Sequence, residues 1–207
     1  MSADRSQGRR ELYRDREQSY VKHVVLRKYL ERFAYIIGSW ADSITYVDGF
    51  SGPWQARSQD FRDTSFAIAI EELRKAQQHL WQTRKKRTSL RCFFVETDNK
   101  AFEQLKGYCE PIKDVEIQIA NSEFEAAISE ICCFIKQPTG KKFAFILVDP
   151  KGWDGFSMTT MSSLLELPRV EVLVNFMTAL LSDFWSHLMH SPNISSKRFL
   201  ETEAFGK

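Results

Sequence analysis

Two segments of the chain share one pattern: an apolar run, then an aspartate, then a turn that contains glycine and proline. Residues 44–54 have the sequence ITYVDGFSGPW, and residues 143–153 have the sequence FAFILVDPKGW. A short apolar run that stops at turn residues is typical of a buried parallel strand. Parallel strands end at one edge of their sheet, and open α/β sheets bind ligands at that edge. We therefore expect Asp48 and Asp149 to flank one crevice.

The rest of the chain alternates between strand and helix patterns. Strands are predicted at residues 43–50, 90–95, 115–119, 142–148 and 170–176, and helices at 19–38, 65–81, 99–109, 123–136, 158–167 and 178–190. Such alternation favours right-handed crossovers and a parallel sheet. We predict an α/β fold with a Rossmann-like, doubly wound, mainly parallel sheet of about five strands and helices on both faces. This single domain spans residues 19–190, between a flexible polar N-terminus (1–18) and a polar tail (191–207).

Composition narrows the class of protein. With 43% hydrophobic and 27% charged residues, the chain is typical of a soluble globular domain, and its net charge of +2 gives no overall attraction to nucleic acid. No apolar run is long enough to span a bilayer, and the N-terminus lacks the apolar segment of a signal peptide. The four cysteines show no C-x-x-C spacing. We therefore predict a cytoplasmic protein without a membrane partner, a disulfide framework or a metal site.

Polar residues lie at the carboxyl ends of the first three predicted strands, and each type suits one part of a nucleoside-bearing cofactor. Asp48 and the turn after it could hold a polar tail, Glu96 could accept both ribose hydroxyls, and Asn121 could bind an adenine edge. The predicted cofactor-binding residues are Asp48, Gly49, Phe50, Ser51, Gly52, Glu96, Asp98, Asn121 and Asp149. The alternative is that the acids only cap turns and helices and that Asn121 only shapes a turn.

The loop after the first strand indicates which cofactor the crevice would bind. It is not G-x-G-x-x-G, and the carboxylate of Asp48 would repel a pyrophosphate. The same carboxylate would attract the ammonium and sulfonium groups of S-adenosylmethionine. The chain also lacks a P-loop lysine pattern. The sequence therefore favours S-adenosylmethionine over nicotinamide cofactors and over nucleotide hydrolysis.

The Asp149-Pro150 pair is similar to a shortened D-P-P-Y motif of amino-methyltransferases that act on bases. Lys151 and Gly152 stand where that motif has its second proline and its tyrosine. The similarity implies that Asp149 accepts a hydrogen bond from a target amine and that Trp153 stacks on the base. Asp149, Pro150 and Trp153 are the predicted catalytic residues.

Two basic clusters raise the question of a polyanionic partner. One is a face of helix 19–38 with Lys22, Arg27, Lys28 and Arg32, and the other is the run RKKR at 84–87. We favour a solvated surface for both clusters. For the helix face, a grip on a nucleic-acid backbone is the functional alternative. The run at 84–87 connects a helix end to a strand start, which places it on the amino edge of the sheet, away from the crevice.

Several of these segments together resemble the three-Cys-motif partner family of bacterial proteins. The matching segments are KYL at 28–30, YVDGFSGP at 46–53, FVETD at 94–98, VDPKGW at 148–153 and VNFM at 174–177. The resemblance implies a class I methyltransferase-like fold and a protein partner of iron–sulfur type encoded nearby. It implies no defined reaction. The C-terminal hairpin usual in methyltransferase sheets is not expected, because nothing after residue 191 has that pattern.

These observations lead to two hypotheses of different class. The first is an S-adenosylmethionine-dependent methyltransferase with nucleic acid as its candidate substrate, supported by Asp48, Glu96 and Asp149. The alternative is a catalytically inactive Rossmann-like binding module in a protein or nucleic-acid complex, such as a phage-defence system. Trp54, whose indole could fill the cofactor pocket, and the missing hairpin favour the alternative.

Overall fold

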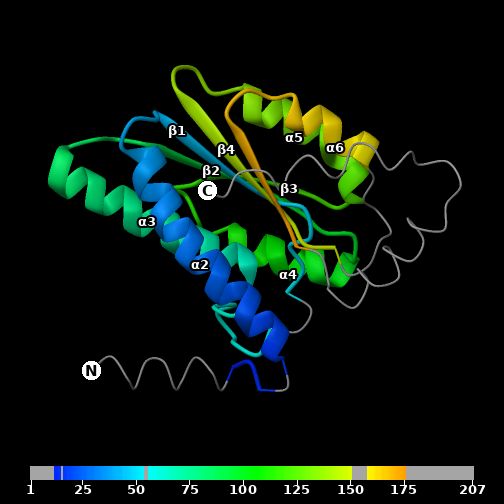
Figure 1. Ribbon diagram of the computed structural model, residues 1–207. Coiled ribbons are helices and arrows are strands. Elements are labelled where there is room, and N and C mark those ends of the chain that lie inside the picture. The colour runs from blue at the N-terminus through cyan, green and yellow to red at the C-terminus, as the bar shows by residue number, and fades with distance from the viewer. Residues whose placement is uncertain (1–11, 15, 54–55, 151–157, 176–207) are drawn as a thin grey trace, which may run out of the picture. The chain divides into compact units, whose positions relative to one another are not determined.

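A computed structural model of the chain describes residues 12–14, 16–53, 56–150 and 158–175 (Figure 1). The helices are α2 (Glu17–Gly38), α3 (Ser65–Arg84), α4 (Asn99–Cys109), α5 (Phe124–Lys136) and α6 (Met158–Leu165). The strands are β1 (Ser43–Asp48), β2 (Ser89–Val95), β3 (Glu116–Ala120), β4 (Lys142–Val148) and β5 (Val170–Val174). The predicted helix at 178–190, the tail and the site residues Trp54 and Trp153 lie outside the described residues.

The five strands form one parallel sheet with the order β3-β2-β1-β4-β5. Helices α2, α3 and α4 cover one face of this sheet, and α5 and α6 cover the other (Figure 1). The predicted fold class is confirmed. Across the described residues, no helix combines the length and the apolarity that a membrane span requires.

The central strand, β1, explains why the sheet needs both helical layers. All six of its residues are buried, as expected for a parallel strand packed on both faces. Ile44 and Tyr46 belong to the core beneath α2 and α3, whereas Val47 belongs to the core beneath α5 and α6. Side chains alternate along a strand, so Asp48 follows Tyr46 toward the α2 and α3 face.

The connections from β1 and β4 create a topological switch point. These two strands are neighbours in register, with Asp48 opposite Leu147. The chain leaves β1 toward α3 on one face and leaves β4 toward α6 on the other. Because adjacent connections part here, the carboxyl edge between β1 and β4 is where an open α/β sheet forms its ligand crevice.

Candidate functional site

Asp48 shapes the turn that follows β1. Its side chain is fully buried, and its two oxygens accept hydrogen bonds from the Phe50 amide (3.1 Å) and the Tyr46 hydroxyl (3.3 Å). The hydroxyl of Ser51 donates to the Asp48 carbonyl at 2.8 Å, and the Ser51 amide donates to the Val95 carbonyl at 2.9 Å. The turn is thereby attached to the end of β2. These contacts match the alternative in which Asp48 organises the turn.

Burial also changes the ionisation of Asp48. Desolvation raises the pKa of its carboxyl group from 3.8 to about 6, although hydrogen bonds from Ser65, Phe50 and Tyr46 favour the charged form. The negative charge of Asp149 raises this pKa further. Asp48 is therefore a weaker acid than an exposed aspartate. Its side chain lies inside the protein and has no exposed oxygen to offer a ligand.

Gly49 is explained by packing within the chain. A Cβ atom at this position would lie 2.6 Å from the Phe124 ring, closer than any real contact allows. The Phe50 ring also packs against Phe124, with 5.6 Å between ring centroids. The glycine lets the turn pass over α5, so its presence does not require a ligand.

The end of β2 offers one carboxylate oxygen. Glu96 is 5% exposed, and its Oε1 accepts a hydrogen bond from the Asp98 amide at 2.8 Å. Within the described part of the chain, its Oε2 accepts no hydrogen bond. Asp98 instead caps α4, because its Oδ1 accepts from the Ala101 amide at 2.8 Å. Glu96 thus keeps an acceptor for a ligand, and Asp98 has the capping role considered as its alternative.

Asn121 lies after β3 and against the turn between β2 and α4. Its side-chain nitrogen lies 2.6 Å from Oδ1 of Asn99. With the amide turned over, the nitrogen donates instead to the Glu96 carbonyl at 2.9 Å. In both orientations the exposed side chain connects β3 to the neighbouring turn and stays beside Glu96.

Asp149, after β4, is held by two residues that the sequence interpretation did not include in the site. Its Oδ1 accepts from Lys22 Nζ of α2 at 2.7 Å and from Asn175 Nδ2, just after β5, at 2.8 Å. Its Oδ2 accepts no hydrogen bond from the described residues. Pro150, the next residue, is buried. The contact with Lys22 shows that the basic face predicted on helix 19–38 is not wholly solvated.

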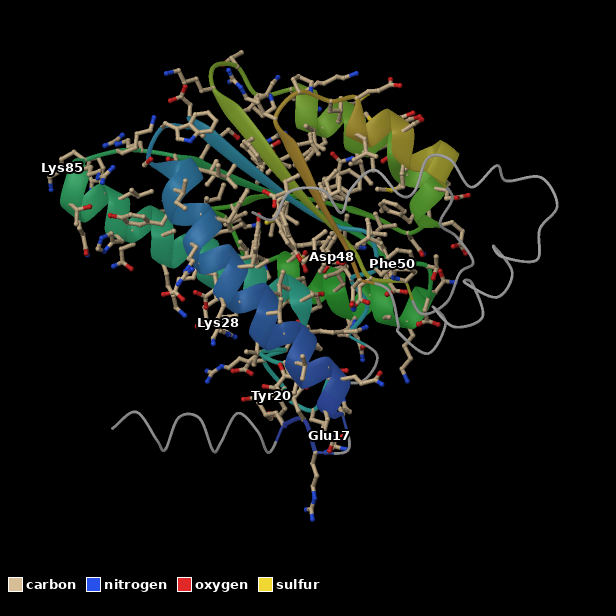
Figure 2. The ribbon with its side chains drawn as sticks, in the orientation of Figure 1. Glu17, Tyr20, Lys28, Asp48, Phe50 and Lys85 are labelled. Atoms are coloured by element: carbon tan, nitrogen blue, oxygen red, sulfur yellow. The ribbon has the colours of Figure 1, made fainter. Side chains whose placement is uncertain are left out.

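A pocket of about 170 Å³ opens where α2, the β1–α3 connection and Asp149 meet. Its lining residues are Arg16, Ser19, His23, Phe50, Gly52, Pro53, Ala56, Asp63, Thr64, Ser65 and Asp149. Figure 2 shows the nearby Asp48 and Phe50 at the end of β1. The predicted site residues Phe50, Gly52 and Asp149 are therefore brought together, whereas Glu96, Asp98 and Asn121 do not line this pocket.

The pocket wall carries charges of both signs. Arg16 donates to Asp63 at 3.0 Å, and Asp63 also accepts from the amides of Arg57 (2.9 Å) and Ser58 (3.2 Å). The N-terminus of α3 reaches the wall at Thr64, whose hydroxyl caps the helix. A helix N-terminus carries partial positive charge. Together with Asp149, the wall thus offers partners for an anion and for a cation.

His23 contributes a neutral side chain to this wall. Burial, with the positive charge of Arg16, lowers its pKa from 6.5 to about 4. Its ring nitrogen Nδ1 lies 2.9 Å from the Tyr13 hydroxyl. The pocket therefore gains no charge from His23 at neutral pH. Among the described residues, no cluster of histidine, cysteine and carboxylate side chains is arranged to hold a metal ion.

Comparisons with known proteins give a distant structural similarity. No protein-family model matches the chain, and no curated protein sequence matches it. A solved structure described as "Putative methyltransferase yhhF from Escherichia coli" is similar in fold, with 16% sequence identity and a TM-score of 0.43. The similarity covers 74% of this chain and 68% of that one. The resemblance to the three-Cys-motif partner family stays a prediction.

Proposed function

We propose that the crevice binds S-adenosylmethionine and that the protein is a methyltransferase dependent on this cofactor. The observation that carries the proposal is the mixed charge of the pocket at the switch point. The free oxygen of Asp149 suits the ammonium of an amino-acid tail, and Arg16 with the α3 N-terminus suits its carboxylate. In this arrangement Asp149 takes the role that the sequence suggested for Asp48.

The neighbouring strand ends fit the nucleoside part of the same cofactor. A volume of about 170 Å³ suits an amino-acid tail, so the nucleoside would extend along the sheet edge toward β2. There, Oε2 of Glu96 is available to ribose hydroxyls, and Asn121 lies beside it with an amide that suits an adenine edge. When bound, S-adenosylmethionine supplies a methyl group on a positively charged sulfur.

The contribution of the chain to catalysis is positioning. Lys22 and Asn175 hold one oxygen of Asp149 and leave the other for the cofactor's ammonium, so the carboxylate is already oriented when the cofactor binds. A fixed geometry of this kind reduces the entropy lost on reaching the transition state. The proposal includes nucleic acid as the methyl acceptor, delivered to the carboxyl edge of the sheet.

Isothermal titration calorimetry with S-adenosylmethionine tests the proposal directly. We expect a dissociation constant of about 10 μM, or about 7 kcal/mol of binding free energy. Asp149→Asn and Glu96→Gln should each weaken binding at least about tenfold, as expected when a charged partner of a ligand is lost. Asp60→Asn is the matched control, because Asp60 is an exposed carboxylate outside the pocket. Absence of binding heat at millimolar cofactor overturns the proposal.

Two observations favour the alternative of a catalytically inactive binding module. The ion pair between Lys22 and Asp149 already neutralises the carboxylate, and about 170 Å³ is less than the roughly 300 Å³ at which small-molecule sites begin. Incubation with S-adenosylmethionine labelled on its methyl group separates the two functions. A methyltransferase transfers label to added RNA, DNA or protein, whereas a binding module transfers none and gives no binding heat.

A further inference from the structure

The opposite end of α3 carries a second polar surface, far from the crevice. α3 ends at Arg84, and Lys85 reverses the chain with a left-handed backbone (φ 54°). Figure 2 shows Lys85 at the end of α3 that points away from Asp48 and Phe50. This surface therefore takes no part in the site described above. It contains the basic run at 84–87, which the sequence alone assigned to solvent.

The cations of this run lie over aromatic rings. The Arg87 guanidinium carbon is 4.7 Å from the centroid of the Trp81 ring, and Lys85 Nζ is 5.6 Å from it. The Arg84 guanidinium carbon is 5.8 Å from the centroid of the Tyr35 ring. Trp81 is nevertheless 41% exposed, so a large indole remains at the surface. A basic run with interleaved rings differs from a simple solvated loop.

The surface has an excess of unpaired positive charge. Within the described part of the chain, four of its cations form no ion pair: Arg32, Arg84, Lys85 and Arg87. The other cations are neutralised locally, as Arg27 pairs with Glu71 and Lys86 pairs with Asp42. Unpaired cations cost little in water and are available to phosphates.

A groove between α2 and α3 continues this surface. Its volume is about 700 Å³, and its lining includes Glu31, Arg32, Tyr35, Ile36, Lys75 and His79. The Tyr35 and His79 rings lie 5.2 Å apart, so the ring that meets Arg84 also forms part of the groove. A groove of this volume accommodates a planar ring system of the size of a nucleobase.

We propose that Trp81, Tyr35 and the four unpaired cations form a binding surface for single-stranded nucleic acid. The cations would contact the backbone phosphates, and the exposed indole of Trp81 would stack with an unpaired base. A duplex hides its bases within the stack, so the rings specifically favour a single strand. Stacking with a ring accepts any base, and we therefore expect little sequence preference. This proposal does not depend on cofactor binding in the crevice.

Fluorescence anisotropy with labelled oligonucleotides of about 20 nucleotides tests the surface. We expect single strands to bind more tightly than the duplex of the same sequence. Four phosphate contacts predict that log K falls with log salt with a slope of about −2.8. Replacing Arg84, Lys85 and Arg87 together by glutamine should reduce that slope by about 2. RNA and DNA strands, measured side by side, show which of the two the surface prefers.

Two further variants separate stacking from charge. Trp81→Ala should weaken single-strand binding roughly tenfold with little change in the salt slope, and Trp81→Phe should retain most of the affinity because a ring remains. The matched charge control replaces Lys100, Lys106 and Lys113 by glutamine, because these exposed lysines on α4 and just after it are outside the surface.

The proposal is overturned by any of three results. These are equal losses for the two triple variants, no loss for Trp81→Ala, and binding of the duplex as tight as that of the single strand. Urea unfolding of each variant confirms that the protein is folded. Calorimetry with S-adenosylmethionine should be unaffected by all of these changes, so this proposal and the proposed function can fail separately.

Discussion

Replacement of Asp48 by asparagine should make the protein more stable at high pH. Burial raises the pKa of the Asp48 carboxyl group from 3.8 to about 6, so the folded state holds this proton more tightly than the unfolded state does. The stabilisation of the folded state by this bound proton is complete below pH 3.8 and is lost as the pH rises through 6. The difference between a pKa of 3.8 and one of about 6 corresponds to about 3 kcal/mol. At pH 8 the ionised, fully buried carboxylate therefore lowers the free energy of unfolding by about that amount.

The asparagine side chain of this variant would keep the shape and most of the hydrogen bonds. Its oxygen can accept from the Phe50 amide, and its nitrogen can donate to the Tyr46 hydroxyl, which now donates to Asp48. We expect Asp48→Asn to be up to about 3 kcal/mol more stable than the natural protein at pH 8. This advantage should disappear near pH 4, where Asp48 is protonated in the folded protein. Urea unfolding at a series of fixed pH values, followed by circular dichroism, measures both ends of the range.

The control for this experiment is Asp60→Asn. A hydrogen bond from Ser58 lowers the pKa of the exposed Asp60, so its contribution to stability is present at neutral pH and is lost as the pH falls. The two substitutions should therefore have pH dependences of opposite sign. The reasoning would be refuted if the free energies of unfolding of Asp48→Asn and the natural protein differed by the same amount at pH 4 and pH 8. It would also be refuted if the variant were the less stable protein at pH 8.

Two other predictions follow from packing and from burial. Gly49→Ala should destabilise the protein by about 1–3 kcal/mol in urea unfolding because its Cβ would meet the Phe124 ring, whereas Gly107→Ala, with open space around it in α4, should stabilise it by up to about 1 kcal/mol. His23 has a pKa lowered by burial and by Arg16 to about 4, so its contribution to stability is complete above pH 6.5 and is lost as the pH falls toward 4. In the same urea experiment, the free energy of unfolding of His23→Gln should fall by about 3 kcal/mol less between pH 6.5 and pH 4 than that of the natural protein. An identical pH dependence in the two proteins would contradict the burial of His23.

The sheet could be predicted because each strand is an apolar run that ends at a turn. The two segments with aspartate at their ends, β1 and β4, are neighbours in the structure, as their shared pattern indicated. The orientation of Asp48 could also have been predicted. Tyr46 and Asp48 are two residues apart on one strand, so both side chains face the core beneath α2 and α3.

The contacts of Asp149 could not be predicted from the sequence. Lys22 is 127 positions away and Asn175 is 26 positions away, and no local pattern relates either residue to the end of β4. α2 precedes the first strand and belongs to no crossover, so its angle across the sheet depends on tertiary packing with α3. Helix periodicity identified its cations but could not show which of them turns toward the crevice.

The distribution of charge along α3 connects the two proposed sites. The net charge of +2 conceals an asymmetry, because carboxylates and cations pair at the carboxyl edge, as in Lys22–Asp149 and Arg16–Asp63, whereas the cations Arg84, Lys85 and Arg87 at the far end of α3 form no ion pair with the described residues. The 20 residues of α3 span about 30 Å, so the two ends are separated by several Debye lengths at physiological salt. Phosphates would therefore be attracted to the Trp81 surface more strongly than to the carboxyl edge, where the charges are paired. A nucleic-acid strand bound at the Trp81 surface would have to extend along α3 to reach the crevice. Nucleic-acid binding and methyl transfer would therefore take place at opposite ends of α3, and each could be lost without the other.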